Sequence, residues 1–364
     1  MNIVLTGPMG SGKTTIGKAL SKSLEMKFLD TDKLIIKKSE MNINEIFLKY
    51  GEKNYRVMEE EIISEVSKLD NHVITTGGGI VLNPLNMRRL RRNGLIINLQ
   101  GSIDTLYKRL KDKKDRPLLK KSTFKKDLKK YSEDRLPFYK NADYIIKTDQ
   151  IEAEKIAKRI VNIMQMPRVR ICGCVAGKNP AKQIQTAIEL GASLVELRLD
   201  LIPNPDISSL VKMSGLPVIA TDRKNKDNLI KAIEARCDFI DIEIESPEKK
   251  IIIEKAKQND CQVIVSMHDF EKIPEKISIE KGNADLLKIA TKVKSIEDCK
   301  RILDLLKNRN DLIVIGMGEF GSFTRIIAPL HGSYLTYASI NKITAPGQLD
   351  LKTMNNIYKC MGLK

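Results

Sequence analysis

The chain has 364 residues, of which 42% are hydrophobic and 30% charged, and its formal net charge is +17. This length favours two globular domains over one, and no apolar run is long enough to span a bilayer, which excludes a membrane protein. The six cysteines have neither a disulfide framework nor zinc-site spacing, so we expect a reducing compartment, the cytoplasm.

The positive charge is concentrated in residues 1–165, which hold 33 basic and 21 acidic residues and so carry +12. Nucleic-acid binding is one interpretation of such a balance. The chain has no Trp, however, and few aromatic residues on which bases could stack. We therefore favour small anionic ligands and expect no nucleic-acid partner.

The first motif is a phosphate loop, G-x-x-x-x-G-K-[ST], which runs from Gly7 to Thr14 between an apolar strand and a helical stretch. Its glycines let backbone N–H groups face phosphate oxygens, and the helix N-terminus adds a positive dipole end. Lys13 is expected to reach the β- and γ-phosphates during catalysis, and Thr14 to bind Mg²⁺. The expected nucleotide-binding residues of this loop are Gly10, Ser11, Gly12, Lys13, Thr14 and Thr15.

Short apolar strands alternate with amphipathic helical stretches through the first half. This alternation predicts a parallel α/β sheet with helices on both faces, in which ligands bind at the carboxyl ends of the strands. The predicted strands are 2–6, 27–30, 72–76, 95–100 and 144–147, and helical patterns include 43–48, 58–69 and 103–111.

Two strand ends carry candidate site residues. After the second strand come Asp30 and Asp32, of which one could lie near a metal and the other accept a substrate proton. A helix cap or turn is the alternative, because Asp favours both. After the third strand, Gly77-Gly78-Gly79 would let the backbone approach a ligand closely, or form a merely flexible loop. Arg56 is placed at the start of a helix.

A basic segment, 108–130, holds twelve Lys and Arg residues against three Asp residues. Such a segment is usually a solvated surface. In a chain with a phosphate loop it could instead be a mobile lid whose arginine stabilises transferring phosphate, with Arg116 at its centre. A second cluster, Arg135-Leu136-Pro137-Phe138-Tyr139, follows.

Residues 1–165 resemble a shikimate kinase, of the nucleoside-monophosphate-kinase-like P-loop fold. The matching motifs, in order, are the phosphate loop, Asp30-x-Asp32, Arg56 before Glu59, Gly77-Gly78-Gly79, Arg116-Pro117-Leu118-Leu119, and Arg135 with Pro137 and Tyr139. The resemblance implies transfer of the ATP γ-phosphoryl group to a shikimate hydroxyl, with ATP and Mg²⁺ as cofactors.

The resemblance also implies roles for single residues. Asp32 would hold shikimate hydroxyls and act as the base, and Asp30 would lie beside Mg²⁺. Arg116 would face the phosphates from the lid, and Arg109 would stack near adenine. The shikimate carboxylate and ring would be held by Arg56, Gly78 and Arg135.

The second half begins after a helical stretch, 151–165, that Pro167 ends. We expect domains of 1–165 and 166–364. From Val169 the strand–helix period is about 22–26 residues, which suggests a compact (β/α)₈ TIM barrel. The predicted strands are 169–175, 194–200, 217–223, 239–244, 262–269, 286–291, 312–317 and 335–340.

Several of these strands alternate apolar and charged residues, as 195–200 and 240–244 do. In a barrel covered by helices the charges must face the lumen, so we expect a functional barrel mouth. Lys288 stands alone in an apolar strand, where a desolvated amine could form a Schiff base. The alternative is a structural ion pair, with Glu243 as its expected partner. His268 ends the preceding strand and is suited to proton transfer.

These segments resemble type I 3-dehydroquinate dehydratase over the whole half. The matching motifs are Glu196-Leu197-Arg198, Arg223, Asp241-Ile242-Glu243, Ser266-x-His268-Asp269, Lys288-Ile289-Ala290, Met317-Gly318, Arg325 and Ala345-Pro346-Gly347-Gln348. Thr344 stands where the family commonly has serine, and 224–227 replace its usual Gly-Gly turn.

The resemblance implies that Lys288 forms an imine with the ketone of 3-dehydroquinate, with no metal or cofactor. His268 would remove the neighbouring proton and protonate the leaving hydroxyl, and Glu243 would orient His268. Arg325 would bind the carboxylate. The ring hydroxyls or the closed loop would be held by Glu196, Arg198, Arg223, Thr344 and Gln348.

The two halves together predict a cytoplasmic bifunctional shikimate-pathway enzyme. We identify no dinucleotide-binding G-x-G-x-x-G after a strand, so the reductive step between the two reactions is expected from a separate shikimate dehydrogenase that docks on this chain. A homodimer through the barrel is a further expectation. The alternatives are another small-molecule kinase fused to a class I aldolase-like barrel, a regulatory nucleotide-binding module, or a nucleic-acid-associated protein.

Overall fold

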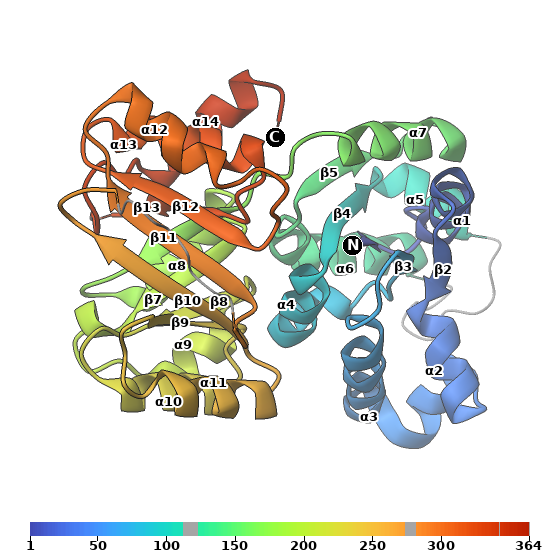
Figure 1. The fold of residues 1–364 in the computed structure, drawn as a ribbon. Coiled ribbons are helices and arrows are strands. Elements are labelled where there is room, and N and C mark those ends of the chain that lie inside the picture. Colours follow the sequence, from blue (N-terminus) through green and yellow to red (C-terminus); the bar gives the residue numbers. More distant parts are fainter. Residues whose placement is uncertain (112–122, 274–281, 342, 364) are drawn as a thin grey trace. The chain divides into compact units, whose positions relative to one another are not determined.

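The computed structural model describes residues 1–111, 123–273, 282–341 and 343–363. The chain divides into two compact units, Met1–Gln165 and Met166–Lys364, which run from blue to green and from green to red in Figure 1. Over the described residues, none of the helices combines the length and apolar character needed to cross a membrane.

The first unit is built on a five-stranded parallel sheet in the order β2-β3-β1-β4-β5. Val4 in the central strand packs into one hydrophobic cluster, and Ile3 and Leu5 pack into another on the opposite face. Helices therefore cover both faces, as predicted. The strands are β1 (Asn2–Thr6), β2 (Lys27–Asp30), β3 (His72–Thr75), β4 (Gly94–Gln100) and β5 (Tyr144–Lys147).

The helices of this unit alternate with the strands along the chain. They are α1 (Lys13–Leu24), α2 (Thr31–Ser39), α3 (Ile43–Val66), the 3₁₀ turn η1 (Ile80–Leu82), α4 (Pro84–Arg92), α5 (Ile103–Leu110), α6 (Phe124–Tyr139) and α7 (Ala153–Met164).

Helix α3 consists of two helical parts joined at Gly51, whose φ of 75° and ψ of 170° are not helical. The two predicted stretches, 43–48 and 58–69, correspond to these parts, but the second part begins before residue 58. Glycine tolerates this left-handed φ, so the chain bends there and continues as helix. Arg56 lies five residues beyond the bend, near the start of the second helical part of α3, in agreement with its expected position.

The second unit is a nearly closed barrel of eight parallel strands in the order β12-β11-β10-β9-β8-β7-β6-β13. The two end strands, β12 and β13, lie in contact without forming a ladder. The helices lie outside the strands in Figure 1. The strands are β6 (Ile171–Val175), β7 (Leu194–Arg198), β8 (Val218–Thr221), β9 (Phe239–Glu243), β10 (Gln262–Asp269), β11 (Leu286–Lys292), β12 (Leu312–Met317) and β13 (Thr336–Ser339).

The helices of the barrel follow the strands in turn. They are α8 (Pro180–Glu189), η2 (Leu199–Leu201), α9 (Ile207–Met213), α10 (Lys226–Glu234), α11 (Lys249–Gln258), α12 (Ile296–Asp304), α13 (Gly321–Ile327), η3 (Ala328–His331) and α14 (Leu351–Cys360).

Strand alternation places the polar side chains inside the barrel. Val195 and Leu197 of β7 pack in the cluster between strands and helices, whereas Glu196 between them lines the lumen. The strand register places Ser266, Lys288 and Glu243 at the same height in the barrel, because Ser266 of β10 pairs with both Lys288 of β11 and Glu243 of β9. The prediction of a polar barrel lumen is confirmed.

Candidate active sites

The first unit holds a cavity of about 420 Å³ at the carboxyl ends of its strands. The phosphate loop forms one wall, and Gly7, Gly10 and Gly12 have φ values of 138°, 79° and 91° that only glycine adopts readily. Lys13 Nζ donates to the backbone oxygens of Gly7 and Pro8, at 2.8 and 3.0 Å, so the lysine folds over the loop.

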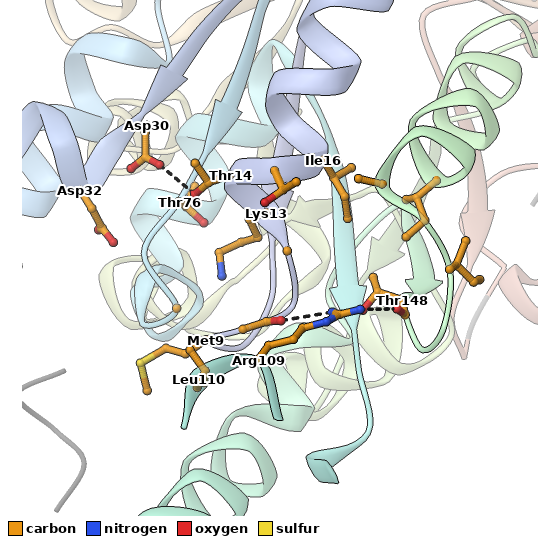
Figure 2. Close-up of a pocket in the computed structure, with 17 residues that line it drawn as sticks. Met9, Lys13, Thr14, Ile16, Asp30, Asp32, Thr76, Arg109, Leu110 and Thr148 are labelled. Atoms are coloured by element: carbon orange, nitrogen blue, oxygen red, sulfur yellow. Dashed lines mark hydrogen bonds between the residues drawn. The ribbon is translucent and has the colours of Figure 1, made fainter. Parts of the chain in front are cut away.

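Thr14 and Asp30 meet at one end of this cavity. Thr14 Oγ1 donates to Asp30 Oδ2 at 3.1 Å, and Asp30 Oδ1 accepts from the backbone N–H of Lys33 at 3.4 Å. Figure 2 shows the two side chains pointing toward one another. Asp30 therefore caps α2, which was the alternative interpretation, and it also lies beside the hydroxyl expected to bind Mg²⁺.

Arg109 lies in another part of the cavity wall. Its guanidinium donates to the carbonyl oxygens of Gly10 and Thr148, at 3.2 and 2.8 Å, and to Thr148 Oγ1 at 3.2 Å. Figure 2 shows these contacts. Arg109 thus ties α5 to the phosphate loop and to the segment after β5. No motif in the sequence indicated Thr148.

The residues of this cavity are chemically suited to bind a nucleoside triphosphate with its metal ion. The N-terminus of α1 and the glycine turn offer backbone N–H groups to phosphate. Ser11 Oγ is buried and has no hydrogen-bond partner among the described residues, as expected of a hydroxyl in a loop that awaits a ligand.

The glycine triplet after β3 packs against the expected acceptor residues. A Cβ on Gly77 would lie 2.7 Å from Asp32 Oδ1, and a Cβ on Gly79 would overlap the Arg56 guanidinium. A Cβ on Gly78 would lie 3.8 Å from Arg135 Nη1. The triplet therefore brings Asp32, Arg56 and Arg135 together by having no side chains of its own.

Two residues to which the sequence analysis assigned no role, Tyr55 and Glu59, complete this corner. Glu59 is 1% exposed and accepts from Arg56 Nη1 at 2.9 Å. Burial raises the pKa of Glu59, although the charge of Arg56 opposes the rise. Tyr55 donates its hydroxyl to Asp32 Oδ1 at 3.2 Å. Their spacing around Arg56, one residue before and three after, is the only signal that could have indicated them.

The predicted kinase residues fall into three groups. Arg56 and Arg135 lie beside the glycine triplet and do not form part of the cavity wall, and Ser11 is a buried member of the phosphate loop that does not line the cavity either. Arg116 lies outside the described residues. The remaining predicted residues line the one cavity: Gly10, Gly12, Lys13, Thr14, Thr15, Asp30, Asp32, Gly78 and Arg109.

The barrel holds a cavity of about 300 Å³ at the carboxyl ends of its strands. Every site residue predicted for this half lines it: Glu196, Arg198, Arg223, Glu243, His268, Lys288, Arg325, Thr344 and Gln348. These residues come from four strands, β7, β9, β10 and β11, and from the segments after β8, β12 and β13.

Lys288 is 6% exposed, and its ammonium lies between Asp241 Oδ2, at 2.9 Å, and Glu196 Oε1, at 3.9 Å. The Tyr337 ring faces it, with 4.4 Å from Nζ to the ring centroid. An ion pair was the alternative expectation, but the expected partner is wrong. Asp241 reaches the amine because it lies one layer deeper in the barrel than Glu243.

Asp241 is completely buried and is held from three sides. It accepts from Arg223 Nη2 at 2.9 Å, from Ser266 Oγ at 2.6 Å, and from Lys288. Burial alone would raise the pKa of Asp241, but the charges of Arg223 and Lys288 outweigh it and hold the pKa well below its usual range. Asp241 therefore stays ionised.

His268 lies near Glu243 at the mouth, with 3.4 Å between Nδ1 and Glu243 Oε1. The Phe270 ring stacks on the imidazole at a centroid distance of 6.2 Å. Burial lowers the pKa of His268, and the charge of Lys288 lowers it further, to about 3. The imidazole is therefore neutral near pH 7, which a base requires.

The three lumen arginines differ in their partners. Arg198 is held by both oxygens of Asp200, and Arg223 lies between Asp241 and Glu243. Arg325 is 1% exposed and donates to Pro346 O at 3.1 Å, without a carboxylate partner among the described residues. Burial lowers the pKa of Arg325 to about 10. Its charge is therefore available to an anionic ligand.

The expectation that no G-x-G-x-x-G follows a strand is wrong, because Gly316, Gly318 and Gly321 have this spacing from the end of β12 to the first residue of α13. A Cβ on Gly321 would overlap the carbonyl of Gly316, and a Cβ on Gly347 that of Gly318. Thr324 Oγ1 accepts from Gly316 N at 2.9 Å. These glycines allow close packing of the chain against itself.

Two family models match the chain: "Shikimate kinase" over residues 9–165 and "Type I 3-dehydroquinase" over residues 171–364. A shikimate kinase of Caldicellulosiruptor bescii is 48% identical over 162 residues, which cover 44% of this chain and 94% of the relative. A 3-dehydroquinate dehydratase of Methanococcoides burtonii is 34% identical over 210 residues, which cover 50% of this chain and 90% of the relative.

Two solved structures are also similar. The shikimate kinase from Acinetobacter baumannii in complex with shikimate has 34% sequence identity and a TM-score of 0.44, and the match covers 45% of this chain and 92% of that one. The 3-dehydroquinate dehydratase from Aquifex aeolicus has 25% identity and a TM-score of 0.47, and the match covers 53% of this chain and 98% of that one.

The low pKa of His268 predicts a pH dependence of stability. Between about pH 6.5 and pH 3 the unfolded chain binds a proton at this histidine that the folded chain does not, so the free energy of unfolding falls as the pH falls. Urea unfolding followed by circular dichroism should show a steeper fall in the wild type than in His268→Gln, by up to about 1.4 kcal/mol per pH unit between pH 6 and 4.5. Parallel curves would contradict the assignment.

Proposed function

Because the chain belongs to the shikimate kinase family in its first half and to the type I 3-dehydroquinase family in its second, we propose how its residues carry out the two reactions. The chain is a bifunctional shikimate-pathway enzyme, a kinase and a lyase. The observation that carries the proposal is that the residues predicted for the lyase line one cavity around Lys288. We take Met1–Gln165 and Met166–Lys364 as the catalytic halves.

In the dehydratase half, Lys288 is the nucleophile. Its amine, once deprotonated, adds to the ketone carbon of 3-dehydroquinate, the carbonyl oxygen leaves as water, and a protonated imine remains. This imine withdraws electrons and acidifies the neighbouring C–H bond. Asp241, 2.9 Å from Nζ, stabilises the positive nitrogen and keeps the lysine side chain in place.

His268 moves the proton in the following steps. The neutral imidazole takes the proton from carbon, and an enamine forms. The enamine expels the hydroxyl group, to which His268 returns the proton, so water leaves. A second water hydrolyses the conjugated imine and frees Lys288. Together these reaction steps release one water, and they need no metal or other cofactor.

The remaining lumen groups bind and orient the substrate. Arg325 holds the substrate carboxylate, because its buried charge has no carboxylate partner among the described residues. Glu243 orients His268 through the 3.4 Å contact with Nδ1. The ring hydroxyls and the loop after β13 are held by Glu196, Arg198, Arg223, Thr344 and Gln348.

The kinase half uses ATP, which supplies the γ-phosphoryl group, together with Mg²⁺, which neutralises phosphate charge. Gly10, Ser11, Gly12 and Thr15 would hold the phosphates, Thr14 and Asp30 the metal, and Arg109 would lie near the adenine, while Lys13 would stabilise the transferring group. Arg116, outside the described residues, belongs to the lid in this proposal.

Shikimate is bound at the glycine triplet. Asp32 takes the proton of the attacking hydroxyl, and Tyr55 fixes the orientation of its carboxylate. Arg56 and Arg135 bind the substrate carboxylate with the backbone of Gly78. The guanidinium group of Arg56 donates to Glu52 and Glu59, at 2.9 Å each, so these carboxylates orient it before the substrate binds.

We further propose that a separate shikimate dehydrogenase docks on this chain, in the cytoplasm, because neither half carries out the reduction between their reactions.

Association of two copies through the barrel stays a prediction, which sedimentation velocity of the 41.1 kDa chain can test.

The docking proposal predicts a difference between the whole chain and its separated halves. With the dehydrogenase, NADPH and ATP, conversion of 3-dehydroquinate to shikimate 3-phosphate should show a shorter lag with the whole chain than with equal amounts of fragments 1–165 and 166–364. Equal lags would remove the reason for proposing docking.

The Schiff base predicts a sharp separation of the two activities. Lys288→Ala should end borohydride trapping of 3-dehydroquinate and lower dehydratase kcat by at least about 10⁴-fold, as expected when a nucleophile is lost. ATP-dependent phosphorylation of shikimate should not change. Lys292→Ala, at the exposed end of the same strand, serves as the matched control. Loss of both activities in Lys288→Ala would show that the halves are not independent.

The base assigned to Asp32 predicts a loss in turnover rather than in nucleotide affinity. Asp32→Asn should lower kinase kcat by about 10²–10⁴-fold and leave the KM for ATP unchanged. Steady-state kinetics with varied ATP measures both. The exposed Asp104→Asn should behave as wild type. A kcat within threefold of wild type in Asp32→Asn would assign the base elsewhere.

A further inference from the structure

Strand β6 presents two cysteines to the barrel lumen. Cys172 and Cys174 are 0% and 3% exposed and belong to the apolar cluster inside the barrel, whereas Ile171 and Val175 pack outside it. From the sequence both thiols would be packing groups. Cys174 differs, because it lines the dehydratase cavity and contacts polar side chains.

The thiol of Cys174 is the middle member of a hydrogen-bonded chain. It donates to Glu196 Oε2 at 3.3 Å and accepts from Gln348 Nε2 at 3.1 Å. Gln348 Oε1 in turn accepts from the backbone N–H and the hydroxyl of Thr344, at 2.8 and 3.0 Å. The chain therefore runs from the loop after β13 to the strand beside Lys288.

The far end of this chain reaches the nucleophile. Glu196 Oε1 accepts from Thr221 Oγ1 at 2.9 Å and lies 3.9 Å from Lys288 Nζ. The ladder between β6 and β7 pairs Cys174 with Glu196 directly, so backbone geometry fixes this contact. Gln348, by contrast, lies in a loop, and the contacts that hold its amide are those with Cys174 and Thr344.

We propose that Cys174 is a positioning residue of the dehydratase site. Its thiol joins the loop that carries Gln348 to Glu196, so that both polar groups face the substrate in one arrangement. The inference rests on the proposed roles of Glu196 and Gln348.

The chemistry of this position requires a group that donates and accepts at once. Glu196 needs a donor, and the amide N–H of Gln348 needs an acceptor. A thiol provides both as long as it keeps its proton. Burial raises the pKa of Cys174, and the charge of Glu196 raises it further, so the thiol stays protonated. Alanine would leave a buried carboxylate oxygen and a buried amide N–H without partners.

Cys172 provides a matched control in the same strand. It faces the lumen two residues earlier, is equally buried, and has no hydrogen bond to the site residues within the described chain. A substitution there tests the loss of thiol volume and of barrel packing without affecting the Glu196–Gln348 link.

The test compares Cys174→Ala, Cys174→Ser and Cys172→Ala in the full chain. Cys174→Ala should lower dehydratase kcat/KM by about 10–100-fold, the size expected for two lost hydrogen bonds at about 0.7–1.4 kcal/mol each. Most of the loss should appear as a higher KM, with borohydride trapping at saturating substrate retained. Cys174→Ser should recover to within about threefold of wild type, and Cys172→Ala should match wild type. Kinase activity of the same samples measures the amount of intact protein.

Three results would overturn the inference: wild-type kcat/KM in Cys174→Ala, equal losses in the serine and alanine variants, or equal losses at Cys172 and Cys174. If Cys174→Ala does not fold, Cys174→Val keeps the volume without the hydrogen bonds and replaces it in the comparison. Absence of dehydratase activity in the wild-type chain would instead contradict the proposed function.

Discussion

A lysine that is buried inside an apolar barrel requires an opposite charge, and much of the second unit follows from that requirement. Asp241 supplies the charge at 2.9 Å from Nζ, and it must itself be held by Arg223 and Ser266 because it is completely buried. Arg223 then extends to Glu243, which lies beside His268. One buried amine thus accounts for a connected set of polar groups on neighbouring strands, and burial together with the charge of this amine lowers the pKa of His268 and keeps it neutral.

The sequence predicted the fold closely because the two patterns that indicate it, apolar runs and their alternation with helical stretches, are local. Apolar runs and their alternation located the strands, and β2, β5, β10 and β12 have the predicted bounds. The bend at Gly51 was not predictable, because a glycine within a helical pattern can end the helix or continue it. Packing of Phe47 and Tyr55 across the bend, at 4.8 Å between ring centroids, is a tertiary contact that the pattern does not contain.

The sequence could predict which residues belong to the site, but not which of them contact one another. Asp241 and Glu243 alternate on the same strand, so both face the lumen, and sequence gives no measure of depth. Depth decides their chemistry, because the Asp241 side chain is fully buried whereas that of Glu243 is 37% exposed at the mouth. Cys174 was missed for a related reason: its partners, Glu196 and Gln348, lie 22 and 174 residues away in the sequence.

The two compact units, each with its own core and cavity, are made from one polypeptide. Every copy of the kinase site is therefore accompanied by one copy of the dehydratase site. A cell cannot raise the concentration of one without the other, so transcription and protein turnover act on both together. The balance between the two fluxes has to be set by the turnover numbers and affinities of the sites themselves. Selection on that balance therefore falls on residues near the two cavities rather than on the level of expression.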